Sequence, residues 1–396
     1  MTSAKRWLLP DGVEEILPGD ASKLEFLRRQ LLDLYESWGY QLVITPLIEF
    51  LDSLLVGSSH DLDLHTFKLT DQLSGRMMGI RADITPQAAR IDAHCLSREG
   101  PVRLCYADSV LHTKPRGLLA SRVPIRVGAE LYGHAGVECD IELICLMHET
   151  LKIAEIGDIH IVLGHVGIFR TLVQEANLDS DTENTLFEAV QRKAYDEIDS
   201  VLESAVADQF LRELLKQLSR LSGGEATLQE AVEVFSDAPA SVRQELQELE
   251  SIVEGVKRRI PEIILCFDLC ELRGYAYHTG IVFAAYTPNY GRAVAKGGRY
   301  DHIGEVFGRA RPASGFDSDL KTIAALSAKT FESKLVIEAP GTDDKDLLNL
   351  IAQLRSQGAI VIDSLNAGES CEQYRKELAC DKQIVNRDGQ WLVEEF

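Results

Sequence analysis

Four short segments of the chain carry side chains of the types that bind a zwitterionic amino acid. One of them, residues 271–286, reads ELRGYAYHTGIVFAAY and holds an arginine, two tyrosines and a histidine close together. The others are IRADITP (80–86), VGAELYG (127–133) and AKGGRYD (295–301). Such a ligand needs a carboxylate for its ammonium group, a cation for its carboxylate group and a fitted side-chain pocket. The candidate residues are Asp83, Thr85, Glu130, Arg273, Tyr277, His278 and Tyr300.

Each of these residues also has an ordinary structural explanation. Arg273 fits a surface ion pair, Tyr277 a core aromatic, and His278 a histidine whose hydrogen bonds are satisfied within the protein. Composition alone does not bring the four segments into one site. From the residues alone, the binding interpretation and the structural one both stay open.

Other chemistries find little support in the sequence. Gly297 and Gly298 belong to no GxGxxG pattern and to no phosphate-binding loop with a lysine and a serine or threonine, and no GxSxG motif occurs. The eight cysteines form no CxxC pair, and no cysteine–histidine spacing matches a zinc site. We therefore predict free thiols in a reducing compartment, no metal ion and no cofactor.

Charge and hydropathy argue against nucleic-acid and membrane binding. A protein that neutralises nucleic-acid phosphates needs a basic face, and the formal net charge of −21 disfavours one. No apolar run approaches the ~18 residues that cross a bilayer. The start, MTSAKRWLLPDG, lacks the apolar stretch of a signal peptide. We expect a cytoplasmic protein.

Helical periodicity near the N-terminus predicts the first helix. Apolar residues recur at helical spacing over 20–38, where Ser22 and Glu25 have the spacing of a capping box and Gly39 can end the helix. The segment that follows is expected to be extended and bent at Pro46.

The candidate binding segments are expected on strands and turns. Apolar–polar alternation or β-branched runs predict antiparallel strands over 76–85, 102–112 and 123–132, with a long helix over 137–156 packed on them. We also predict that the first part of ELRGYAYHTGIVFAAY lies on a strand, and that the sheet finishes with strands over IVFAAYT (281–287) and RAVAKGG (292–298). GGRYD is predicted to be a glycine-rich turn.

Composition divides the chain into a core, an insertion and a tail. Residues 178–258 are rich in Glu, Gln, Asp and Leu with little β-branching, which predicts a helical insertion within a core of residues 1–327. Residues 328–396 have the pattern strand, helix, strand, helix and hairpin, which predicts a small α/β domain. The predicted class is α+β.

Together these segments resemble the catalytic core of histidyl-tRNA synthetases, which have the class II aminoacyl-tRNA synthetase fold. The resemblance runs from about residue 8 to about residue 327. It implies an antiparallel sheet of six or seven strands flanked by helices, and a dimer through the region around Pro46. The matching segments, in order, are LLPDGVEEILP, ITPLIEF, IRADITPQAAR, PVRLCYADSVLHTKPRG, VGAELYG, RGYAYHTG and AKGGRYD.

The resemblance implies that the amino-acid half of the synthetase site is retained. The family's contacts to histidine fall on Asp83, Thr85, Glu130, Arg273 and the pair Tyr277–His278. Asp83 stands where the synthetases usually have glutamate, and His278 where they usually have tyrosine. Arg126 replaces a glutamine that helps to bind the ammonium group. A cation at Arg126 would repel the ammonium unless Asp83 or Glu130 pairs with it.

The ATP half of the site departs from the synthetase pattern. The arginine that holds the ATP α-phosphate is replaced by His112, and the acidic residue two places on by Lys114. The arginine of the closing motif is replaced by Thr322. Fixed cations stabilise a triphosphate, and one arginine can be worth ~10³ or more in rate. We therefore expect no amino-acid activation, and no catalytic residue of its own.

Two longer stretches, RGYAYHTGIVFAAY and AVAKGGRYDHIGEVFGRARPASGFDSDL, resemble one branch of this family in particular. That branch comprises the regulatory subunits of ATP phosphoribosyltransferase. Its implied partner is a short-form catalytic subunit in the first step of histidine biosynthesis, in a hetero-octamer, with L-histidine as effector. The alternatives are an unusual histidyl-tRNA synthetase in which other residues serve ATP, and a paralogue that binds an amino acid and some other protein.

Overall fold

The computed structural model describes residues 7–55, 60–115, 117, 120–272, 274–275, 277–288, 290–330, 334–365, 372–377 and 379–396. The chain forms two compact units, which divide between Lys329 and Thr330. The first is built on a large sheet with helices, and the second on a small sheet with helices. The predicted class, α+β with a small C-terminal α/β unit, is confirmed.

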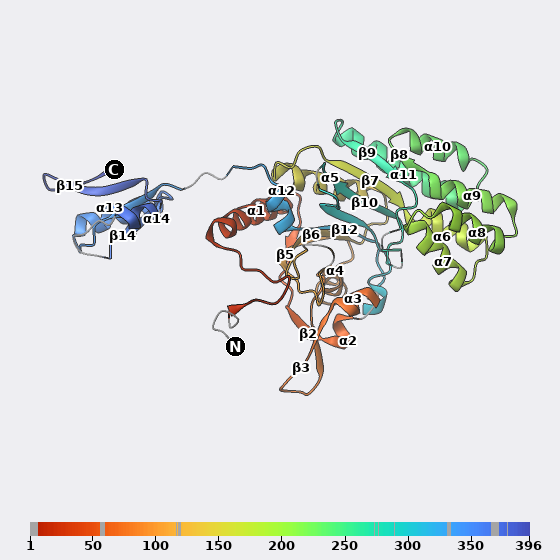
Figure 1. Cartoon of the computed structure of the whole chain (residues 1–396), viewed down its shortest axis with the longest axis horizontal. Helices are drawn as coiled ribbons and strands as arrows, with labels where there is room; N and C mark the ends of the chain where they lie inside the picture. The colour runs from red at the N-terminus through yellow and green to blue at the C-terminus, as the bar shows by residue number, and fades with distance from the viewer. Residues whose placement is uncertain are drawn as a thin grey trace. The chain divides into compact units, whose positions relative to one another are not determined.

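A nine-stranded sheet forms the centre of the first unit. Its strands are β1 (Gln41–Leu42), β5 (Val102–Ser109), β6 (Ile125–Tyr132), β7 (His160–His165), β8 (Ser222–Gly223), β9 (Ile264–Asp268), β10 (Ile281–Tyr286), β11 (Ala295–Arg299) and β12 (Ala313–Asp319). The order is β1-β5-β6-β12-β11-β10-β7-β9-β8. Figure 1 labels these strands from β5 to β8 in this order, except β11. All pairs from β5 to β7 in this order are antiparallel, whereas β1 joins β5 and β9 joins β7 in parallel. The implied antiparallel sheet is therefore present, and it is wider than expected.

A separate three-stranded antiparallel sheet lies beside it, with β2 (Ile48–Phe50), β4 (Met77–Ile80) and β3 (Phe67–Thr70) in that order. The short helices α2 (Leu51–Leu54) and α3 (His60–His65) connect its strands. The predicted strand over 76–85 is therefore wrong in its end and in its sheet. Thr85 begins helix α4 (Thr85–Arg90), because Pro86 suits the first helical turn.

Three helices pack on the large sheet and against one another: α1 (Pro18–Ser37), α5 (Glu138–Ile153) and α12 (Leu320–Leu326). The predicted helices are confirmed, but the capping box is wrong. Helix α1 begins at Pro18, and Ser22 Oγ donates to Pro18 O at 2.9 Å within the helix. Gly39 adopts φ +84° just after the helix, as a glycine that ends a helix does. Two short turns complete this part, a π-helix (Ile91–Leu96) and a 3₁₀ helix (Glu305–Phe307).

Helices occupy the segment predicted as an insertion and gather at one end of the first unit (Figure 1). They are α6 (Val166–Glu175), which leads into it, then α7 (Ser180–Gln191), α8 (Tyr195–Ala205), α9 (Gln209–Arg220), α10 (Ala226–Val234) and α11 (Ala240–Arg259). Asp179 and Asp208 cap α7 and α9 through their side chains. Helix α11 packs against α5 and α6, which ties the insertion to the sheet.

The second unit has a four-stranded sheet in the order β14-β13-β15-β16. Its elements are β13 (Val336–Ala339), α13 (Lys345–Ser356), β14 (Ile360–Asp363), α14 (Glu372–Glu377), β15 (Lys382–Arg387) and β16 (Gln390–Glu395). This is the predicted succession of elements. Its core includes Ile337, Leu347, Ile351, Val361 and Ile384.

Two predictions near the candidate site are wrong. Residues 274–278, among those described, form a turn before β10 rather than a strand. The strand predicted at RAVAKGG is present as β11 and extends to Arg299, in the middle of the sheet, so the turn predicted at GGRYD begins too early. The strand β12 was not predicted. Glycines usually weaken strands, but Gly297 faces Gly315 O and the ring of Phe283 so closely that a side chain would clash.

Candidate functional site

A buried carboxyl group, that of Glu130 on β6, forms the centre of the candidate site. Its Oε1 accepts hydrogen bonds from Thr85 Oγ1 at 2.8 Å and from Tyr106 OH at 2.9 Å. Its Oε2 accepts a hydrogen bond from Tyr300 OH. Only 1% of the Glu130 surface is exposed. Three hydroxyl groups from α4, β5 and the end of β11 therefore surround one carboxyl.

The strand register explains why Glu130 has room for these partners. Gly315 on β12 is paired with Glu130 on β6. A Cβ atom at Gly315 would overlap Glu130 Oε2 and lie 2.5 Å from Tyr300 OH. A glycine is thus required at this position, because any side chain would fill the space that the carboxyl occupies.

Burial raises the pKa of Glu130 well above its ordinary value, and the charges of Asp83 and Asp317 raise it further. The hydrogen bonds from Thr85 and Tyr106 act in the opposite direction. A carboxyl in this environment holds a proton strongly when no cation is near. A cationic ligand would compensate the charge, so the site is suited to a group such as an ammonium or imidazolium.

An aromatic group lies beside Glu130. The rings of Tyr277 and Tyr300 are stacked, with centroids 5.0 Å apart and planes 24° apart. The His278 ring meets the Tyr277 ring edge-on at 5.2 Å. Burial lowers the pKa of His278 to about 4, so its imidazole is neutral near pH 7. Because Arg299 O lies 3.1 Å from Nδ1, that nitrogen carries the proton.

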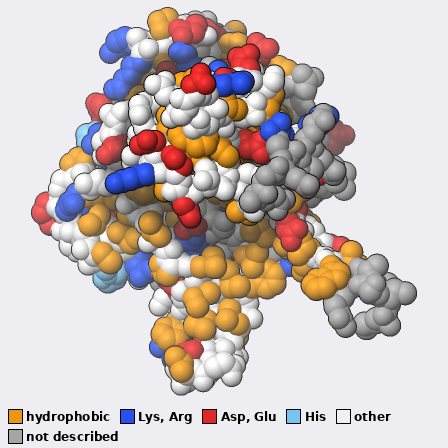
Figure 2. Space-filling model, turned by 90° about the vertical axis from the view of Figure 1, so that its left-hand side faces the viewer, with side chains coloured by type: hydrophobic (Ala, Val, Ile, Leu, Met, Phe, Trp, Pro, Cys, Tyr) orange, Lys and Arg blue, Asp and Glu red, His pale blue; other side chains and the backbone are white. Residues whose placement is uncertain are grey.

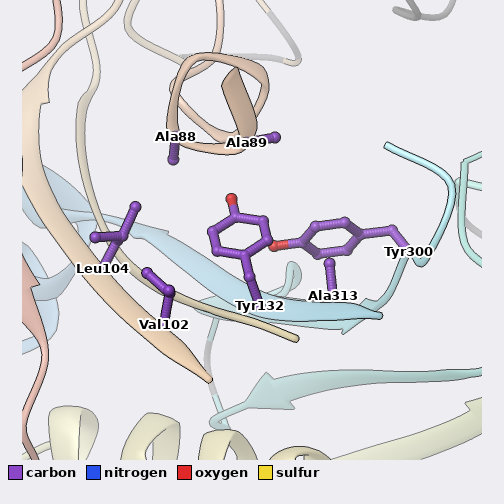
Figure 3. Close-up of a cluster of buried hydrophobic side chains, with 7 residues drawn as sticks. All are labelled: Ala88, Ala89, Val102, Leu104, Tyr132, Tyr300 and Ala313. Carbon is purple, nitrogen blue, oxygen red and sulfur yellow. The ribbon is translucent and has the colours of Figure 1, made fainter. Parts of the chain in front are cut away.

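Two further hydroxyl groups are buried without a hydrogen-bond partner among the described residues, those of Tyr132 and Tyr277. Tyr132 belongs to the hydrophobic cluster that α4 covers with Ala88 and Ala89, and Figure 3 shows it beside Tyr300. Burial is the main cause that raises the pKa of both hydroxyls, and the charge of Glu130 is the second. Both hydroxyls therefore lie close enough to Glu130 to interact with its charge. Buried polar groups are nearly always satisfied, and a polar ligand here would supply the missing partners.

Arg126 has a different partner from the two that the sequence suggested. Its Nη1 lies 3.2 Å from Asp317 Oδ2 on β12, rather than in an ion pair with Asp83 or Glu130. Burial alone would lower the pKa of Arg126, but Asp317, Asp83 and Asp319 together raise it. Asp83 Oδ1 accepts from the N–H groups of Ile84 and Thr85, at 2.7 and 3.4 Å, which fixes it at the start of α4. The positive charge of Arg126 is therefore compensated within the protein.

Of the eight predicted residues, the structure brings seven together through hydrogen bonds, ring contacts or charge interactions. They are Asp83, Thr85, Arg126, Glu130, Tyr277, His278 and Tyr300. Arg273 lies outside the described residues. Sequence reasoning missed Tyr106, Asp317 and Gly315 as parts of the site. The signal for Tyr106 was a polar group within a largely apolar strand, whereas Asp317 lies on β12, which was not predicted. The strand register decides which residues neighbour both side chains.

The positions at which the sequence resemblance implies that ATP-binding arginines are replaced make other contacts in the structure. His112 is buried, with Nε2 3.0 Å from Ala82 O. Thr322 Oγ1 lies 3.4 Å from both Asp319 Oδ2 and Tyr290 OH. Lys114 is exposed. Neither His112 nor Thr322 has a guanidinium group that could bind a triphosphate.

Within the described ranges, no group of three or more His, Cys, Asp or Glu side chains is arranged to hold a metal ion. The cysteines at 95, 105, 139, 145, 266, 270 and 380 are free thiols. A search of the same residues finds no helix with the length and hydrophobicity that a membrane span requires.

A second unusual carboxyl group lies between the insertion and the sheet. Glu245 on α11 accepts a hydrogen bond from Thr171 Oγ1 on α6 at 3.0 Å, and its Oε2 has no partner among the described residues. Burial raises the pKa of Glu245 from 4.5 to about 7.

We expect this group to make the stability of the protein pH-dependent. Between pH 4.5 and about 7, folded Glu245 keeps a proton that the unfolded chain has lost, so it destabilises the fold as pH rises. Glu245→Gln should remove this pH-dependent loss of stability, because glutamine does not ionise. Urea unfolding at about pH 5 and about pH 8 should show a smaller decrease in the free energy of unfolding for the variant. Glu254→Gln, exposed on the same helix, is the control and should behave as the wild type.

Comparison with known proteins places this fold among the histidyl-tRNA synthetases and their relatives. Residues 12–323 match the family model of histidyl-tRNA synthetase, and residues 334–394 match that of the ATP phosphoribosyltransferase subunit HisZ C-terminal domain. A histidyl-tRNA synthetase from Nostoc has the same fold, with a TM-score of 0.79 at 18% identity over 98% of this chain and 97% of that one. The first unit therefore has a class II synthetase-like fold.

Full-length relatives show which branch of this group of proteins the chain resembles. ATP phosphoribosyltransferase regulatory subunits from Stutzerimonas stutzeri and Marinobacter nauticus are 52% and 50% identical over 394 residues, which is 99% and 100% of this chain and 99% of each relative. The chain belongs to the family of ATP phosphoribosyltransferase regulatory subunits. A Bacillus halodurans structure described as an ATP phosphoribosyltransferase regulatory subunit/histidyl-tRNA synthetase has a TM-score of 0.83 at 25% identity, over 95% of this chain and 97% of that one.

Proposed function

We propose that this chain is a non-catalytic regulatory subunit of ATP phosphoribosyltransferase. It activates a short-form catalytic subunit and makes it sensitive to histidine, in the first step of histidine biosynthesis in the cytoplasm. Membership of the family over the full length supports the regulatory role. The replacements at His112 and Thr322 support the absence of amino-acid activation, because the fixed cations of an ATP site are not supplied there.

The observation that carries histidine binding is the buried cluster at Glu130. Histidine would place its ammonium group at Asp83 and Glu130 and its carboxylate at Arg273. Its imidazole would lie against Tyr277, His278 and Tyr300. Exchange of the ammonium and imidazole groups between the two acids is the alternative arrangement. The hydroxyls of Tyr132 and Tyr277, which have no hydrogen-bond partner among the described residues, and the raised pKa of Glu130 support a polar, cationic ligand beside Glu130.

The assembly that the family resemblance implies is a dimer of this chain within a hetero-octamer. Hydrophobic side chains gather on the three-stranded sheet and the segment leading into it (Figure 2). Ile44, Leu47, Ile48 and Met77 are all exposed there. This apolar surface around Pro46 suits the implied dimer contact, because large apolar patches on a surface mark interaction sites.

The direct test measures phosphoribosyl-ATP formation by a short catalytic subunit from the same organism. The rate should rise when this chain is added, and histidine should then inhibit it. Pyrophosphate exchange that depends on histidine should be absent when this chain is assayed alone. If this chain alters neither the rate nor the inhibition, the regulatory function is wrong, and exchange at synthetase-like rates would identify a synthetase instead.

Arg273→Ala should weaken inhibition by histidine far more than it weakens assembly. Loss of a cation that pairs with a ligand carboxylate costs ~1.5–3 kcal/mol, or about 10- to 150-fold in the histidine concentration for half-inhibition. Titration of histidine into the assembled complex gives this value, and co-purification of the catalytic subunit reports assembly. Arg243→Ala, on the exposed side of α11, is the control. Unchanged inhibition of Arg273→Ala would show that the carboxylate binds elsewhere.

A further inference from the structure

The turn that precedes β10 is held by α7 of the helical insertion and by α6, which leads into it. Tyr275 lies in this turn, and its hydroxyl donates to Glu183 Oε1 on α7 at 2.7 Å. Its ring packs against Phe187 of α7, at 5.3 Å between centroids, and edge-on against Phe169 of α6, at 5.5 Å. The side chain of Tyr275 therefore extends away from the sheet and into the insertion.

The backbone of the same turn is held by Arg170 on α6. Arg170 Nη2 donates to Tyr275 O at 2.6 Å and to His278 O at 2.9 Å. Its guanidinium group also lies over the ring of Tyr275, 4.9 Å from the centroid. One side chain thus fixes two carbonyl groups of the turn and the aromatic ring between them.

Among the described residues, the hydrogen bonds within the turn are backbone ones. The N–H groups of Tyr277 and His278 both donate to Gly274 O, at 2.7 and 2.8 Å. Gly274 has φ +67°, and a Cβ atom there would lie 2.7 Å from His278 Cδ2, so a glycine is needed both for the backbone and for the approach of the ring. A turn of this kind depends on its outside contacts for a single conformation.

We propose that α7, the first helix of the insertion, together with α6 sets the histidine affinity at Glu130 by holding this turn, with Tyr275 and Arg170 as positioning residues. The inference rests on the proposed function, because it takes Tyr277 and His278 to be histidine contacts. Tyr277 and His278 follow Tyr275 in the same turn. A change in the position of Tyr275 against α7 therefore moves Tyr277 and His278 as well. Without the contact, only a fraction of the molecules hold the turn in its binding conformation, and histidine must order it in the rest. The apparent affinity for histidine is then the intrinsic affinity multiplied by that fraction.

The test compares variants that remove or keep the Tyr275–Glu183 hydrogen bond. Calorimetric titration of histidine into the full-length chain should give dissociation constants about five- to tenfold higher for Tyr275→Phe and for Glu183→Ala, because each loses a hydrogen bond to a charged group. Glu183→Gln keeps an acceptor oxygen and should stay within about twofold of the wild type. The double variant Tyr275→Phe/Glu183→Ala should be no weaker than either single variant, because both remove one interaction.

A matched control and a ligand-free measurement separate this inference from the proposed function. Tyr195→Phe, in the same insertion, alters a tyrosine whose ring lies under Arg220, and it should leave histidine affinity unchanged. Hydrogen exchange without histidine should speed up at the amides of Tyr277 and His278 in Tyr275→Phe, and not in Tyr195→Phe. If the wild type binds no histidine, the proposed function fails, whatever the exchange result. If the wild type binds histidine, and Tyr275→Phe and Glu183→Ala bind it as tightly, the positioning role is wrong.

Discussion

Glu130→Gln should reduce the affinity for histidine by about a hundredfold or more, because it removes the buried negative charge and keeps the shape of the side chain. A charged hydrogen bond contributes ~1.5–3 kcal/mol, and pairs desolvated in a pocket often more. Burial raises the pKa of Glu130. As the pH rises above the ordinary pKa of a glutamate, this group therefore lowers the free energy of unfolding. A neutral glutamine should therefore leave the free energy of unfolding at pH 7 unchanged or higher.

Two measurements together make this result specific. Calorimetry reports histidine binding, and urea unfolding of the same variant reports stability. Glu262→Gln, on the exposed turn before β9, is the control and should match the wild type in both. If Glu130→Gln binds histidine normally, the pocket at Glu130 is part of the core and not a ligand site. If affinity and stability fall together, the loss of binding reflects damage to the fold.

Arg81→Met should lower the free energy of unfolding by about 3–5 kcal/mol, the usual effect of breaking a buried charged network from one side. Arg81 is 1% exposed and lies just after β4. Its guanidinium donates to Thr45 O at 2.8 Å and to Ser109 O at 2.9 Å, and it pairs with Asp108 at 2.7 Å. It thus joins the bend before Pro46, the end of β5 and the start of the segment that carries Asp83.

Urea unfolding followed by circular dichroism gives this value, with the transition of the first unit fitted separately if the two units unfold apart. Arg29→Met is the control, because Arg29 is exposed on α1 in a pair with Glu25 and should change stability by less than about 0.5 kcal/mol. A loss below about 1 kcal/mol for Arg81→Met would mean that the network is replaced by water or by other contacts.

The turn from 274 to 278 illustrates why part of the site escaped sequence reasoning. Its tyrosines and its histidine resemble a strand pattern, and the segment that follows is a strand. The conformation is decided by Arg170, which is far away in sequence and binds two carbonyl groups of the turn. Such long-range contacts leave no local signal.

The glycines of β11 and β12 also show that contacts between distant residues leave no signal in the local sequence. RAVAKGG predicted a strand that ends at Gly298, whereas GGRYD predicted a turn from Gly297 onward, since glycine is frequent in turns and weak in strands. The structure places Gly297 and Gly298 in the middle of the sheet, where Gly297 is close to the backbone of Gly315. The requirement for glycine comes from the neighbouring strand, and only the three-dimensional packing contains it.

By itself the sequence determined the long helices, the helical composition of the insertion, the succession of elements in the C-terminal unit and the four segments proposed to bind the ligand. These follow from local periodicity and from motifs, which need no knowledge of distant residues. Only the tertiary structure decided that Arg126 pairs with Asp317, that three hydroxyl groups surround Glu130, and that Tyr275 connects the site to the insertion. Ion pairs, burial and pKa values depend on which residues the register and the packing bring together, and spacing along the chain does not specify those neighbours.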